Sequence, residues 1–104
     1  MLKARVIPCL LLHDGSLVKT VRFDRFAYIG DPVNTVRIFN ELEVDELIVL
    51  DILASVERRE PNYALIEQIT SECFRPLTYG GGVRGVDDAR RLQDLGIEKI
   101  AVNA

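Results

Sequence analysis

Three consecutive glycines, Gly80, Gly81 and Gly82, stand between a short apolar run and a segment with helical periodicity. Glycine lets the backbone approach a ligand closely, and the free N–H groups of such a loop and of the following helix favour an anion. A tight turn between a strand and a helix would need only one glycine. The run therefore predicts a phosphate-binding loop, and Asn103, at the end of another apolar run, could donate a hydrogen bond to the same phosphate.

Two charged residues are candidates for chemistry beside such a ligand. Asp51 directly follows four apolar residues and could orient a substrate or transfer a proton, although capping of the following segment is an equally good reading. Lys19 lies in the long segment 13–30 and could close over an anionic ligand, or it could simply be solvated. Asp51 and Lys19 are thus possible catalytic residues, with a structural alternative open for each.

Composition narrows the classes of function. The net charge of −3 argues against general nucleic-acid binding, which normally relies on a basic face. His13 is the single histidine, and Cys9 and Cys73 lack metal-ligand spacing, so no metal or other cofactor is expected and the thiols are predicted to be buried and free. No apolar run approaches the roughly 20 residues that cross a bilayer, and the start does not resemble a signal peptide, so a cytoplasmic location is expected.

Apolar runs alternate with longer amphipathic segments along the 104 residues. Strands are predicted near residues 6–12, 47–50, 76–79 and 99–102, because near-continuous apolar runs are typical of parallel strands covered on both faces. Helices are predicted over 31–42, 61–73 and 86–95, from an Asp-Pro start, a Pro start and a Gly stop. The order β-α-β-α-β-α-β predicts an α/β fold with parallel strands and right-handed crossovers.

Two features of this pattern leave alternatives open. Segment 13–30 is much the longest connection and is interpreted as a loop that is either functional or disordered. Four parallel strands could begin an open doubly wound sheet or a closed barrel, and periodicity does not separate them. Four strands by themselves leave two strand edges open, which would favour pairing with a second copy.

The chain resembles the cyclase subunit of imidazole glycerol phosphate synthase. The resemblance covers the chain from end to end and is carried by Arg5-Val6-Ile7-Pro8-Cys9-Leu10, Asp14-Gly15, Val18-Lys19, Gly30-Asp31-Pro32, Asp45-Glu46-Leu47, Leu50-Asp51, Ala54-Ser55 and Gly80-Gly81-Gly82. Members of that family are (βα)8 TIM barrels of roughly 250 residues. The resemblance therefore implies that residues 1–104 are a single N-terminal half-barrel segment.

The resemblance also implies an activity and its partners. Members of the family are lyases of histidine biosynthesis in which a glutaminase subunit releases ammonia, and the barrel condenses it with a phosphorylated nucleotide substrate. Gly82 and Asn103 match the N-terminal phosphate site of the family. Arg5, Glu46 and Lys99 match a ring of charges around the ammonia entrance, and Glu98 is a candidate docking residue for the glutaminase.

One residue departs from the histidine-pathway pattern. The family carries a catalytic aspartate where this chain has Leu11, and leucine cannot transfer a proton. This departure favours a paralogous branch that resembles the histidine enzyme but supplies ammonia for an acetamidino group on bacterial surface sugars. Whether the chain is an enzyme stays open: the main expectation is a phosphate-binding half-barrel that is inactive alone. The alternatives are a standalone half-barrel that pairs with a second copy or a complementary half-barrel, and a non-catalytic docking module for a glutaminase.

Overall fold

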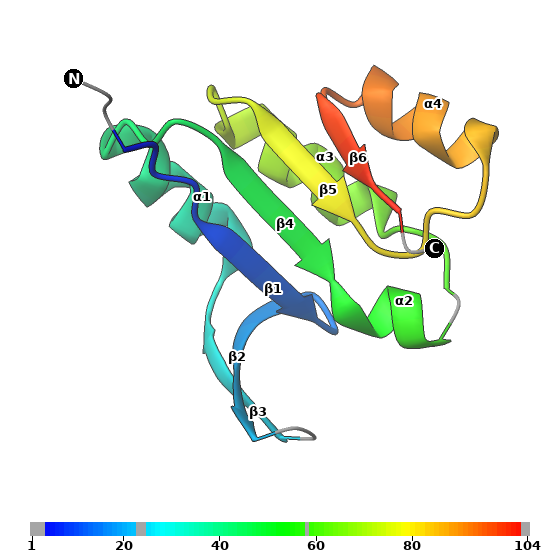
Figure 1. Cartoon of the computed structure of the whole chain (residues 1–104), viewed down its shortest axis with the longest axis horizontal. Coiled ribbons are helices and arrows are strands. Elements are labelled where there is room, and N and C mark those ends of the chain that lie inside the picture. The colour runs from blue at the N-terminus through cyan, green and yellow to red at the C-terminus, as the bar shows by residue number, and fades with distance from the viewer. Residues whose placement is uncertain (1–3, 23–24, 58, 103–104) are drawn as a thin grey trace.

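The computed structural model describes residues 4–22, 25–57 and 59–102. They form a sheet with the strand order β3-β2-β1-β4-β5-β6 and helices packed against it (Figure 1). The strands are β1 (Cys9–His13), β2 (Ser16–Arg22), β3 (Arg25–Gly30), β4 (Leu47–Asp51), β5 (Leu77–Gly80) and β6 (Lys99–Ala101). The helices are α1 (Pro32–Glu41), α2 (Ile52–Glu57), α3 (Tyr63–Glu72) and α4 (Val86–Asp94).

The four predicted strands, β1, β4, β5 and β6, pair in parallel in the order in which they occur along the chain. Tyr79 on β5 lies opposite Val49 on β4 and Ile100 on β6. The α/β class with a sheet dominated by parallel strands is therefore confirmed. The sheet of the described residues is open rather than closed into a barrel.

The described residues of segment 13–30 form the antiparallel strands β2 and β3, so the interpretation of this segment as a loop was wrong. Asp14 and Gly15, with φ of 54° and 80°, form the turn that joins β1 to β2. Two consecutive left-handed residues match the twist of an antiparallel pair, which is why Asp-Gly suits this position. β2 then pairs with β3, and the hairpin extends away from the helices (Figure 1).

The helix ends follow local chemistry. The Asp31 side chain accepts a hydrogen bond from the N–H of Asn34 at 3.0 Å, which caps α1 one residue before Pro32. Asn62 caps α3 in the same way through the N–H of Leu65 at 3.1 Å. The predicted helix positions are thus confirmed within a few residues. The short helix α2 was not predicted.

The two faces of the sheet differ in burial. Leu12, Leu47 and Val49 point toward α1, α3 and α4 and are buried in one core with helix residues such as Val36 and Ile66. The opposite face carries Cys9, Leu11, Ile48 and Leu50, which are exposed or half-buried.

The thiols differ from the prediction in part. Cys9 is exposed because it lies on the face that the helices do not cover, so its predicted burial was wrong. Cys73 is half-buried, and both are free. Among the described residues, the helices are all too short or too polar to cross a membrane.

Candidate functional site

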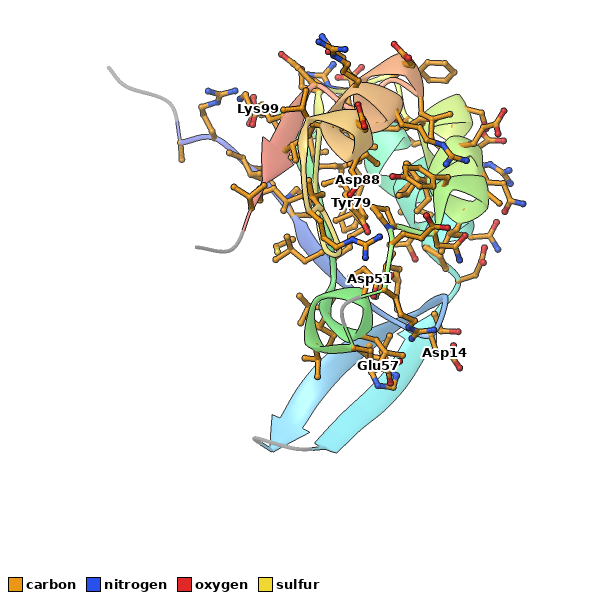
Figure 2. The ribbon with its side chains drawn as sticks, turned by 90° about the vertical axis from the view of Figure 1, so that its right-hand side faces the viewer. Asp14, Asp51, Glu57, Tyr79, Asp88 and Lys99 are labelled. Atoms are coloured by element: carbon orange, nitrogen blue, oxygen red, sulfur yellow. The ribbon has the colours of Figure 1, made fainter. Side chains whose placement is uncertain are left out.

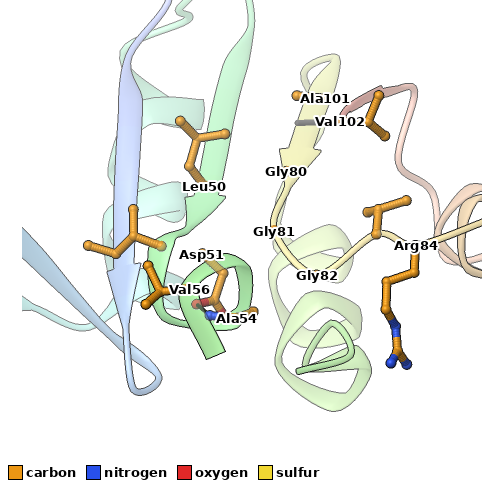
Figure 3. A pocket seen from close by; sticks show the side chains of 12 residues that line it. Leu50, Asp51, Ala54, Val56, Gly80, Gly81, Gly82, Arg84, Ala101 and Val102 are labelled. Carbon is orange, nitrogen blue, oxygen red and sulfur yellow. Dashed lines mark hydrogen bonds between the residues drawn. The ribbon is translucent and has the colours of Figure 1, made fainter. Parts of the chain in front are cut away.

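A cavity of about 620 Å³ lies at the carboxyl ends of β4, β5 and β6 (Figure 3). Loops at this end of parallel strands are where α/β proteins commonly bind ligands. The lining comes from the ends of these strands, from α2 and from the loop before α4. It includes the glycine loop, with Asp51 and Arg84 as its charged residues.

Each of the three glycines is required by close packing. A Cβ on Gly80 would lie 2.9 Å from the Leu50 side chain, and one on Gly81 would lie 2.5 Å from the Asp51 carbonyl oxygen. A Cβ on Gly82 would overlap the Arg59 carbonyl oxygen. The run of glycines thus has a packing explanation as well as the phosphate-binding one, and phosphate binding stays a prediction.

Asp51 caps the helix that follows it, which was one of the two interpretations of this residue. Its Oδ1 accepts a hydrogen bond from the N–H of Ala54 at 3.0 Å, which begins α2. The residue also lines the cavity beside Gly81. Capping explains why an aspartate ends β4, and a role in proton transfer stays a prediction.

The remaining residues predicted for the mouth of the barrel fall in different places. Lys19 belongs to β2, where its backbone pairs with Ala27. Asn103 lies outside the described residues. Leu11 is half-buried on β1 and pairs with Leu50, so the position where the resemblance implied a catalytic aspartate is part of an apolar surface.

The charged residues predicted for the opposite end come together. Glu46 Oε1 lies 2.8 Å from Arg5 Nη2 and 3.2 Å from Lys99 Nζ, at the starts of β4 and β6. The hydrogen bond from Lys99, with the charges of Lys99 and Arg5, lowers the pKa of Glu46 against the effect of burial. Figure 2 shows Lys99 near the top of the molecule and Asp51 well below it. Glu98 is exposed beside Lys99.

Two tyrosines at the glycine loop were missed. The buried hydroxyl of Tyr79 donates a hydrogen bond to the carbonyl oxygen of Gly81 at 2.8 Å. Tyr63 donates to Asp88 Oδ1 at 2.9 Å, and Asp88 Oδ2 accepts from the N–H of Arg84 at 3.0 Å. Burial, aided by Asp88, raises the pKa of Tyr63 to about 12, and the Arg84 N–H together with Tyr63 lowers the pKa of Asp88.

The sequence carried only part of this signal. Asp88 stands three residues into the first turn of α4 after Gly85, where an acid commonly reaches back to a backbone N–H. Nothing local predicted that Tyr63, 25 residues away, would reach the same carboxylate.

Comparison with known proteins identifies the family of the chain. A family model described as histidine biosynthesis protein matches residues 5–104. The chain belongs to the histidine biosynthesis protein family. Its resemblance to cyclase subunits of imidazole glycerol phosphate synthase is also confirmed, because the curated relatives carry that name.

Three relatives illustrate the range of similarity. A Pseudomonas aeruginosa protein provisionally named imidazole glycerol phosphate synthase subunit hisF2 is 55% identical over 103 residues, or 99% of this chain. A Leptospira borgpetersenii protein provisionally named as the HisF subunit is 56% identical over the whole chain, and the HisF subunit of Streptococcus mutans is 42% identical. The chain spans 41% of the length of each of these relatives.

Proposed function

We propose that this chain forms the phosphate-binding N-terminal half of a HisF-like barrel that uses ammonia from a glutaminase. The observation that carries the proposal is the glycine loop, which lines the cavity at the carboxyl ends of the parallel strands. Backbone N–H groups in such a loop bind a phosphate without a side-chain partner. Arg84 adds a positive charge to the lining, and Asn103 follows β6, the strand beside the loop.

A titration with inorganic phosphate tests this proposal. Backbone amide resonances of the full chain are followed by NMR at constant ionic strength, with chloride as the control anion. Phosphate should shift the amides of Gly81 and Gly82 in particular. Asn103→Ala should weaken binding, whereas Gln93→Ala, which removes an exposed amide from α4, should leave it unchanged. Equal shifts with chloride and phosphate would refute the phosphate site.

We further propose that the chain by itself does not catalyse the cyclase reaction. Leu11 stands where the resemblance implies a catalytic aspartate, and leucine cannot transfer a proton. Its neighbour on β4 is Leu50, which cannot do so either. An assay with ammonium salt and the family's nucleotide substrate should show no turnover above buffer. Measurable turnover that is lost on phosphate-site substitution would contradict this assignment.

We propose that the protein belongs to the branch that supplies ammonia for an acetamidino group on bacterial surface sugars. Leu11 supports this assignment, because it stands where the resemblance to the histidine-pathway enzyme implies a catalytic aspartate. The gene that encodes the protein should fail to restore growth of a histidine-requiring hisF mutant. Restored growth would place the protein in the histidine pathway.

The Arg5–Glu46–Lys99 cluster favours a second role, docking of a glutaminase. The cluster and the exposed Glu98 present charged groups at the end of the sheet opposite the cavity. Mixing the chain with a glutaminase subunit of the family should raise glutamine hydrolysis. Lys99→Glu and Glu98→Lys should each abolish that stimulation, and unchanged stimulation in both would rule out docking at this surface.

The partly exposed sheet face favours pairing of half-barrels. Leu11, Ile48 and Leu50 lie on the face opposite the helices, and β6 is an open edge. Covering them with a second copy or a complementary half-barrel would remove this apolar surface from water. Light scattering on a size-exclusion column should report a dimer, and Leu50→Lys should shift the mass toward the monomer.

A further inference from the structure

We infer that Tyr79 is a positioning residue that holds the peptide between Gly81 and Gly82 with its N–H facing the cavity. This inference deepens the proposed function and rests on it for the identity of the ligand. It concerns the orientation of one peptide group, which decides whether the loop offers an anion a donor or an acceptor.

The first step is the hydrogen bond itself. Tyr79 is 1% exposed and points from β5 into the core on the helix side of the sheet. Its hydroxyl donates to the carbonyl oxygen of Gly81 at 2.8 Å, and the pair is buried. Burial raises the pKa of Tyr79, so the hydroxyl stays protonated and remains a donor across the neutral range.

The second step follows from peptide geometry. A trans peptide is planar, and its C=O and N–H point in opposite directions. No cis peptide occurs among the described residues. Because the Gly81 carbonyl points toward Tyr79 on the helix side, the N–H of Gly82 points away from it. That other side carries Gly80, Leu50 and Ala101, which line the cavity.

The third step concerns what else restrains this peptide. Gly81 and Gly82 have φ of 133° and 73°, and neither carries a Cβ that would favour one orientation of the peptide between them. The hydrogen bond from Arg84 to Asp88 fixes the far end of the loop but does not involve this peptide. Without the Tyr79 hydroxyl, the peptide could rotate and turn the Gly81 oxygen toward the cavity. A carbonyl oxygen there would repel a phosphate.

The test compares Tyr79→Phe with Tyr63→Phe. Both substitutions remove only a hydroxyl from a buried tyrosine, and both hydroxyls donate to an oxygen near the loop. Only the Tyr79 hydroxyl bonds the Gly81–Gly82 peptide. Tyr63→Phe leaves Asp88 Oδ2 bonded to the N–H of Arg84, so it is a control for the general effect of losing a buried hydroxyl.

Two readouts are taken on the full chain. In inorganic phosphate titrations, Tyr79→Phe should lower the affinity about tenfold and Tyr63→Phe no more than about twofold, since one hydrogen bond typically contributes about a factor of ten. Without phosphate, the Gly82 amide should shift and exchange faster in Tyr79→Phe than in the wild type. Wild-type phosphate affinity together with an unchanged Gly82 amide in Tyr79→Phe would overturn the inference.

The readouts separate failure of the inference from failure of the proposed function. If the wild type binds no phosphate, the proposed site is wrong, yet the ligand-free Gly82 amide still reports whether Tyr79 orients the peptide. If Tyr79→Phe does not fold, the wild type supplies the measurement. Its Tyr79 hydroxyl proton should be visible in slow exchange with solvent, and a hydroxyl proton in fast exchange would overturn the inference.

Discussion

Replacing Gly82 by alanine tests the close packing of the loops around the cavity. Two separate costs are expected at this position. The φ of 73° is a left-handed conformation, which costs an L-residue about 1–2 kcal/mol, offset by about 0.4–1 kcal/mol because alanine restricts the unfolded chain. The new Cβ would also overlap the Arg59 carbonyl oxygen, so backbone must move, at a cost of about 1–3 kcal/mol.

The chain contains a matched control for the first of these costs. Gly15 has φ of 80°, nearly the same conformation, but a Cβ built there meets no atom within 4 Å. Gly15→Ala should therefore lower the free energy of unfolding by only about 0.5–1 kcal/mol. Gly82→Ala should lower it by about 2–4 kcal/mol, and the difference isolates the contact with Arg59.

Urea unfolding monitored by circular dichroism measures this difference. With a slope of about 1–2 kcal/mol per molar urea, the midpoint of Gly82→Ala should lie about 1 M below that of Gly15→Ala. The slopes should be equal, which would show that the compactness of the two states is unchanged. Equal midpoints for the two variants would refute the packing argument and leave phosphate binding as the reason for glycine at position 82.

Three further perturbations have expected outcomes. Glu46→Gln should lower the urea midpoint at pH 7, because the hydrogen bond from Lys99 and the charges of Lys99 and Arg5 lower the pKa of Glu46 below its ordinary 4.5. The Glu46 contribution is therefore complete above pH 4.5 and is lost as the pH falls through the lowered pKa, so the difference from the wild type should shrink with acidification below 4.5. A difference that stays constant as the pH is lowered would contradict this. In alkaline absorbance titrations, Tyr63 should ionise near pH 12. Its contribution to the free energy of unfolding is therefore complete below pH 10 and lost by about pH 12. Tyr63→Phe should remove only the absorbance change near pH 12. Asp51→Ala should cost about 0.5–2 kcal/mol in urea unfolding through loss of the cap on Ala54, with Asp51→Asn close to wild type; equal losses in both variants would argue against capping.

Local sequence chemistry predicted the parallel strands and three helices. Near-continuous apolar runs are typical of parallel strands, and these runs form β1, β4, β5 and β6 although helices cover one face of the described sheet. Asp31 and Asn62 precede helices because their side chains accept hydrogen bonds from backbone N–H groups there. The same reasoning failed at segment 13–30. Asp14-Gly15 is typical of a hairpin turn, but the length of the connection favoured a loop.

The sequence predicted several residues of the site but not the contacts that hold them in place. Gly80 to Gly82 and the cluster of Arg5, Glu46 and Lys99 were identified from residue type and family resemblance. The structure brings the charged cluster together and places the glycines at the cavity. It also shows a capping bond for Asp51.

The sequence alone determined the class of fold, the family and the identity of the glycine loop, because these depend on residue type, periodicity and order along the chain. Only the tertiary structure decided which groups meet. Tyr63 on α3 reaches Asp88 on α4 because the two helices pack at a particular distance and angle. The Tyr79 hydroxyl reaches the Gly81 carbonyl oxygen because of the backbone conformation directly after β5. Hydrogen bonds form over about 3 Å, and contacts of that precision between separate elements depend on the packed core rather than on local pattern.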